Sequence, residues 1–245
     1  MAQPPKITID TARLTKAIDT VKQGGDTYAA IAELESSSDP VDVAQHYSQL
    51  LRELYFQEKN VPLMVMFGRA GIGYALSQAK RIEANDPQTA ESLRGIAKTI
   101  SYNLSVNCWP GWGDEGVTIT PSDLVAGYDA ALLNLRLAGE LKRDAEVVGN
   151  AHWAIGAHHL AAGRHADAIA AFDKSAAEFA KADKPDFERM AKGYAALSST
   201  LAPNAAPAAG KKYDATLGDL KSLKTEDAKF FAEQIETAAA VFSNP

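Results

Sequence analysis

The chain has 245 residues and a net charge of −6, and 46% of its residues are hydrophobic while 23% are charged. This composition is typical of a soluble globular protein and excludes a wholly disordered chain. The acidic balance argues against nucleic-acid binding, because recognition of phosphates needs a basic surface. Alanine, at 45 residues, favours closely packed helices, since it is the best helix former.

Hydrophobic residues recur at intervals of three and four along most of the chain, which predicts an all-α protein of about ten helices. Capping residues before Pro40, Pro87 and Pro121 mark three of the helix starts. In chain order, the expected helices cover about 11–21, 28–34, 40–55, 62–82, 87–107, 121–143, 146–162, 165–181, 185–201 and 226–242.

Two stretches interrupt this pattern. Residues 108–120 contain Trp109 and Trp112 beside glycines and acidic residues. Residues 202–224 begin with a segment rich in Ala, Pro and Gly, and we expect an irregular insertion there. Neither stretch is long enough to separate independent domains, so a single all-helical domain is expected over residues 1–245.

The compartment is inferred from features that the sequence lacks. The first residues, MAQPPKITID, contain no hydrophobic segment typical of a signal peptide, and no long apolar run predicts a membrane span. The single cysteine, Cys108, has no partner for an internal disulfide and suits a reducing compartment. We therefore expect a cytoplasmic protein that does not enter a membrane, with Cys108 buried at a helix end.

Residues 149–182 follow a recognisable order of small and aromatic residues. Ile155 and Gly156 stand where a repeat has Leu-Gly, Ala168 stands at a small position, and Phe172 stands at an aromatic position. This segment resembles a tetratricopeptide repeat. The resemblance implies two antiparallel helices that touch at Gly156 and Ala168, and antiparallel helical hairpins stacked as an α-solenoid. A helical bundle with one accidental match is the alternative.

The resemblance also implies a binding surface, because the first helix of each repeat in that family lines the ligand groove. On this chain the corresponding positions, with Trp112 at their edge, are Asn150, Trp153, Ala157, Leu160, Thr99, Tyr102, Val106 and Trp109. Their character suggests an apolar, aromatic groove for another protein or a peptide. In the alternative arrangement, the protein's own loop or N-terminal helices fill the groove. A homo-oligomer is compatible with either arrangement.

Enzymatic or small-ligand chemistry is the second functional hypothesis. Asp114 and Glu115 lie beside the two tryptophans of the 108–120 loop, as carboxylates do in sugar-cleaving sites. The segment 68–73, GRAGIG, lacks the Lys and Ser/Thr that complete a phosphate-binding loop, and it favours close helix packing instead. We therefore predict no catalytic residue and no cofactor.

Four of the five histidines lie between His152 and His165. They lack the spacing of four residues that places two imidazoles on one metal ion, so no metal site is predicted. We expect His159 to replace a core tyrosine of the repeat and His158 to lie on the surface.

Overall fold

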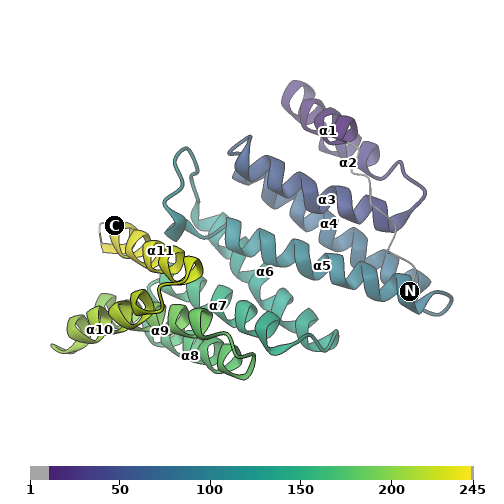
Figure 1. Cartoon of the computed structure of the whole chain (residues 1–245). Helices are drawn as coiled ribbons and strands as arrows, with labels where there is room; N and C mark the ends of the chain where they lie inside the picture. Colours follow the sequence, from purple (N-terminus) through teal and green to yellow (C-terminus); the bar gives the residue numbers. More distant parts are fainter. Residues whose placement is uncertain (1–10, 244–245) are drawn as a thin grey trace. The chain divides into compact units, whose positions relative to one another are not determined.

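The structure, a computed structural model, describes residues 11–243, which form eleven α-helices and one short 3-10 helix (Figure 1). The helices are α1 (Thr11–Gly24), α2 (Thr27–Leu34), α3 (Pro40–Phe56), α4 (Val61–Ile82), α5 (Pro87–Asn107), η1 (Pro110–Trp112), α6 (Pro121–Glu140), α7 (Ala145–Ala161), α8 (His165–Lys181), α9 (Pro185–Leu201), α10 (Ala209–Ser222) and α11 (Glu226–Ser243). The predicted all-α class is confirmed. The segment 1–10, in which a signal peptide was sought, lies outside the described residues.

Helix starts follow the capping residues in the sequence. The Asp39 carboxylate accepts the N–H of Val41 at 2.8 Å, directly before Pro40. Thr120 and Asp123 form a reciprocal capping box at the start of α6. None of the helices within residues 11–243 has both the length and the apolar character needed to cross a lipid bilayer.

Helix α10 corrects one prediction, because residues 202–224 were expected to be irregular. The helix begins at Ala209, after Pro203 and Pro207, so neither proline interrupts its hydrogen bonds. Leu217 and Leu220, three residues apart, are buried in the core that α10 shares with its neighbours. The prolines end the preceding helix, but they do not prevent a new one.

The chain packs into two compact units, Met1–Leu104 and Ser105–Pro245, with the boundary inside α5. We call them unit 1 and unit 2, and the single domain expected from the sequence stays a prediction. In unit 1, α1 packs on α2 and α3 packs on α4. A Cβ at Gly71 would lie 2.6 Å from the Cβ of Tyr47, so this glycine allows α3 and α4 to approach closely. The GRAGIG segment is therefore part of a helix contact, as predicted.

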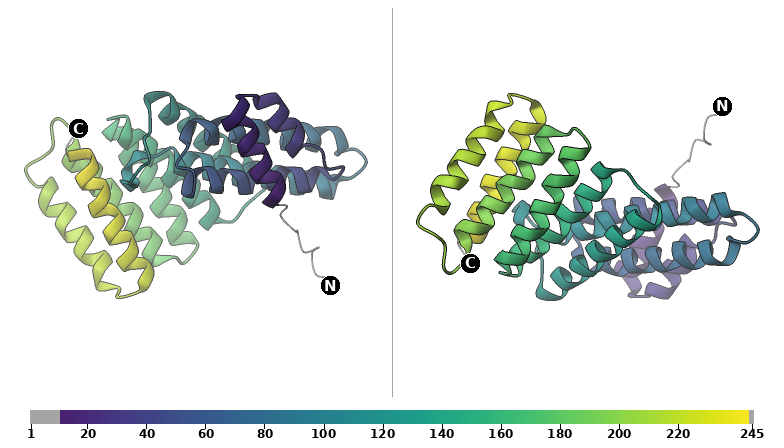
Figure 2. Two further views of the ribbon diagram at one scale, coloured as in Figure 1. Left: turned by 90° about the horizontal axis from the view of Figure 1, so that it is seen from above. Right: turned by 90° about the horizontal axis from the view of Figure 1, so that it is seen from below.

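In unit 2, helices that follow one another along the chain pack side by side, from α6 to α10, and α11 packs on both α9 and α10 (Figure 2). Helices α7 and α8 approach closely at Gly156, where a Cβ would lie 2.7 Å from Cδ1 of Phe172. Ala168 of α8 is fully buried. The predicted packing of α7 on α8 is confirmed at Gly156, while the contact of Ala168 with α7 stays a prediction.

Three successive turns of unit 2 share one backbone geometry. After α6, α7 and α8, a single residue has a left-handed conformation, with φ of 49° at Lys142, 69° at Gly163 and 53° at Asp183. At each turn this residue donates its N–H to the carbonyl three residues earlier, and the next residue donates to the carbonyl five residues earlier. This is the Schellman motif. The same local device therefore joins α6, α7, α8 and α9, although a glycine occupies it only once.

Candidate functional site

The loop after α5 inserts a tryptophan into unit 2. Trp109 has an extended backbone, η1 follows it, and Gly113 turns the chain with a φ of 63°. The indole N–H of Trp109 donates to the main-chain carbonyl of Ala157 in α7 at 2.8 Å. Trp112 donates its indole N–H to the carbonyl of Val106, in the last turn of α5, at 2.7 Å. Both indoles are therefore held by hydrogen bonds to the backbone.

Aromatic side chains from four segments meet around Trp109. Its ring centroid lies 4.8 Å from that of Trp112, 5.5 Å from Trp153 of α7, 5.8 Å from Tyr194 of α9 and 5.9 Å from Phe242 of α11. Most of these contacts are edge-to-face, an arrangement that aromatic rings favour. The loop is thus part of the hydrophobic core of unit 2.

This packing buries four of the predicted groove residues of unit 2. Trp109, Trp153, Ala157 and Leu160 are only 1%, 4%, 1% and 2% exposed. Trp109 and Trp112 of the loop pack on Trp153, so the loop fills the groove, which is one of the two self-filled arrangements that the sequence left open. The second element at the cluster is the C-terminal α11, through Phe242, and not an N-terminal helix. Buried side chains of this kind offer no surface to a partner.

The other predicted residues are more accessible. Trp112, Val106 and Asn150 are half-buried, and Asn150 donates its side-chain amide to the carbonyl of Glu146 at 3.0 Å. Thr99 and Tyr102 lie in unit 1, where Thr99 is exposed and Tyr102 is half-buried. The structure therefore gathers the tryptophans, Ala157 and Val106 in unit 2, while Thr99 and Tyr102 belong to the other unit.

One pocket remains open beside the aromatic cluster, between η1 and α11. Its volume is about 210 Å³, and its lining residues are Gly111, Trp112, Phe230, Glu233, Gln234 and Thr237. Phe230 is 56% exposed, which is unusual for so large an apolar side chain. Gly113 lies against α11, since a Cβ there would be 3.3 Å from Cγ2 of Thr237. We call this depression the Trp112–Phe230 pocket.

Phe230 was not predicted as a site residue, although the hydrophobic pattern of α11 contains a signal for it. The apolar stripe of α11 runs through Ala228, Phe231, Ile235 and Ala238, all of which are buried. Phe230 lies outside this stripe, so the helical period places it on another flank. The pocket also requires the contact between the loop and α11, which no local pattern indicates.

The histidines correct a second prediction. His158, expected on the surface, is 1% exposed, and its Nε2 lies 3.1 Å from the carbonyl oxygen of Ser105. His159, expected in the core, is half-buried beside the ring of Tyr128 at 5.2 Å. The reason is that Ser105 and α6 pack on the flank of α7 that carries His158: a Cβ at Gly127 would lie 2.5 Å from its Cε1.

Burial also determines the titration of His158. It lowers the pKa of this imidazole to about 4, because the charged ring loses its hydration. The Nε2 of His158 also lies 3.1 Å from the hydroxyl oxygen of Ser105, so the imidazole contacts both oxygens of that residue. Cys108 is buried, as predicted. Within residues 11–243 no group of three or more His, Cys, Asp or Glu side chains is arranged to hold a metal ion.

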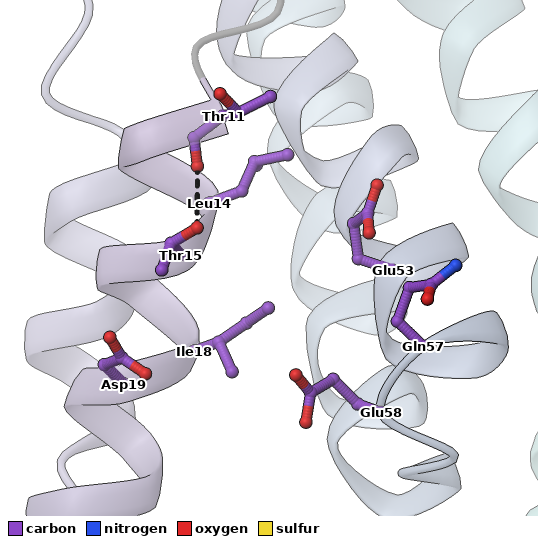
Figure 3. Close-up of a pocket in the computed structure, with 8 residues that line it drawn as sticks. All are labelled: Thr11, Leu14, Thr15, Ile18, Asp19, Glu53, Gln57 and Glu58. Atoms are coloured by element: carbon purple, nitrogen blue, oxygen red, sulfur yellow. Dashed lines mark hydrogen bonds between the residues drawn. The ribbon is translucent and has the colours of Figure 1, made fainter.

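Unit 1 has a pocket of its own, of about 200 Å³, between α1 and the end of α3 (Figure 3). Leu14 and Ile18 point between the two helices, and Glu53 of α3 and Glu58 of the turn after α3 approach from the other side. Glu58 is engaged by Lys22 in an ion pair. The pocket combines carboxylates with the aliphatic side chains of Leu14 and Ile18, and no second feature indicates a ligand.

Comparison with known proteins gives no further assignment. No protein-family model matches the chain, and no curated protein matches it in sequence. The observations that bear on function are therefore the residues of the two units themselves.

Proposed function

We propose that this protein is a tetratricopeptide-like scaffold that binds a segment of another protein, and that the Trp112–Phe230 pocket is its docking point. The observation that carries the proposal is the open aromatic pocket beside an otherwise closed groove. Phe230 is 56% exposed and the half-buried Trp112 lies in the same depression. Exposed aromatic side chains in pockets dominate the binding energy of protein interfaces.

The regular packing of unit 2 supports a scaffold role. Stacked helical hairpins, each resting on the next, create a long rigid surface, and such arrays commonly bind other proteins. The three equivalent turns at Lys142, Gly163 and Asp183 support the repeat resemblance in the same way.

The size and composition of the pocket favour a side chain over a small-molecule substrate. Its volume of about 210 Å³ is below the range of about 300–1,000 Å³ typical of ligand sites. Among its six lining residues only Glu233 is ionisable, so the pocket contains no acid–base pair for catalysis.

A selection from a library of random displayed peptides tests this function. We expect the full chain to enrich binders that are lost with Phe230→Ala, because the aromatic wall of the pocket is removed. Leu132→Ala is the matched control, since Leu132 is another exposed apolar side chain of unit 2, on α6. Failure to enrich any peptide, or equal loss of binding in both variants, would refute the proposal.

A further inference from the structure

We propose that the Trp112–Phe230 pocket accepts a positively charged side chain of the bound segment, with a guanidinium group as the best match. The inference rests on the proposed function, because it names the chemistry that the same site would recognise.

One flank of α11 provides most of the pocket. Phe230, Glu233, Gln234 and Thr237 are spaced by three and four residues, so they lie on one stripe of the helix. Phe230 and Glu233 are both exposed. The stripe therefore places an aromatic ring and a carboxylate one turn apart, both open to solvent.

The loop provides a second aromatic wall in a fixed position. Trp153 stacks on Trp112 with ring centroids 5.6 Å apart and an interplanar angle of 30°, and the hydrogen bond to Val106 holds the indole N–H. The remaining exposed part of Trp112 lines the pocket. Because this ring is already held, binding costs little conformational entropy on the protein side.

The charges around the pocket favour a cation. None of the six lining residues is basic, and among residues 11–243 the Glu233 carboxylate forms no ion pair. Glu233 also lines an adjacent depression at the start of α11, together with Lys221, Lys224 and Lys229. Lys221 is engaged there by Glu236 at 2.6 Å, and none of the three lysines forms an ion pair with Glu233 among the described residues. Glu115, exposed in the same loop as Trp112, adds further negative charge.

A guanidinium group satisfies both features at once. It is planar, so it stacks on aromatic rings, and its N–H groups donate to a carboxylate in pairs. Phe230 and Trp112 would contact its faces, while Glu233 would accept its hydrogen bonds. A neutral side chain of the same shape, such as citrulline, could still donate an N–H to the carboxylate, but it lacks the positive charge that strengthens this bond and the stacking on the rings.

Nuclear magnetic resonance of the full chain tests this inference directly. The three indole N–H signals are observed, and that of Trp112 is assigned from its loss in Trp112→Phe. The probes are N-acetyl-arginine methylamide and its neutral isostere, N-acetyl-citrulline methylamide. We expect the arginine probe to shift the Trp112 signal with an affinity at least about fivefold higher than the citrulline probe. Added salt should weaken only the arginine probe.

Two variants identify the carboxylate. Glu233→Gln should reduce the affinity for the arginine probe to that for citrulline, whereas Glu236→Gln, on the same helix but paired with Lys221, should leave it unchanged. Equal affinities for the two probes, or no shift of the Trp112 signal with either, would overturn the inference. The peptide selection would still judge the proposed function, because it assumes nothing about charge.

Discussion

Gly111 lies flat against the indole of Trp109, and a Cβ at this glycine would come within 2.2 Å of Cζ2. No side chain fits there unless the loop moves away from the core. Gly111→Ala should therefore destabilise unit 2 by about 1–3 kcal/mol, as overpacking does. Urea unfolding followed by tryptophan fluorescence measures this loss. Gly139→Ala is the control, since a Cβ there meets nothing within 4 Å, and an unchanged Gly111→Ala curve would contradict the packing.

The two buried tryptophans differ in their hydrogen bonds. Trp109 donates its N–H to Ala157, whereas the buried N–H of Trp153 has no acceptor among the described residues. Removing a satisfied donor loses a hydrogen bond, but removing an unsatisfied one relieves a penalty. Trp109→Phe should therefore cost about 1–2 kcal/mol more than Trp153→Phe in the free energy of unfolding. Equal costs in chemical denaturation would argue against the assigned hydrogen bonding.

The turn after α6 uses a lysine where the equivalent turn after α7 uses a glycine. A left-handed backbone is strained by about 1–2 kcal/mol for residues with a Cβ. Lys142→Gly should raise the stability by about 0.5–1 kcal/mol once the flexibility of glycine is counted, and Gly163→Ala should lower it. Lys142→Ala keeps the strain and removes the charge. If it stabilises as much as Lys142→Gly, charge and not backbone conformation is responsible.

The buried His158 should make the stability dependent on pH. Its pKa is about 4 in the folded protein, below the value of about 6.5 in an unfolded chain. Between these values the unfolded state binds more protons, so the free energy of unfolding falls by about 1.4 kcal/mol per unit as the pH decreases. His158→Gln should flatten the profile from pH 6.5 to 4 relative to wild type. Parallel profiles would show that other groups determine the dependence.

Ala168 tests the contact between α7 and α8. It is fully buried, so Ala168→Leu should force the helices apart and cost about 1–3 kcal/mol. Ala166→Leu is the matched control, because Ala166 is exposed on the same helix. A melting temperature lowered equally by both substitutions would place the effect in α8 itself, and not in the contact.

The sequence predicted the features that depend on neighbouring residues. Thr120 and Asp39 cap their helices as expected, because capping is decided within four residues. Helix α10 was missed because Pro203 and Pro207 dominated the local pattern, while Leu217 and Leu220 gain their stability by burial in the shared core.

The site depended on contacts that span the whole of unit 2. An aromatic strip could be predicted from Trp109, Trp112 and Trp153, but its cover could not. Phe242 lies against Trp109 from the other end of the unit, and no spacing rule connects them. The burial of His158 and His159 was predicted the wrong way round for the same reason. The packing of Ser105 against α7 determines which of the two imidazoles is buried.

The contact between Trp109 and Phe242 also has a consequence during synthesis on the ribosome. Trp109 is made before α7, α9 and α11, yet its ring is buried against residues of all three. Domains whose core depends on such distant residues complete their folding late and expose apolar surface until then. The nascent chain therefore carries uncovered tryptophans until α11 emerges from the exit tunnel. Chaperones that bind apolar segments have their longest access to this protein in that interval.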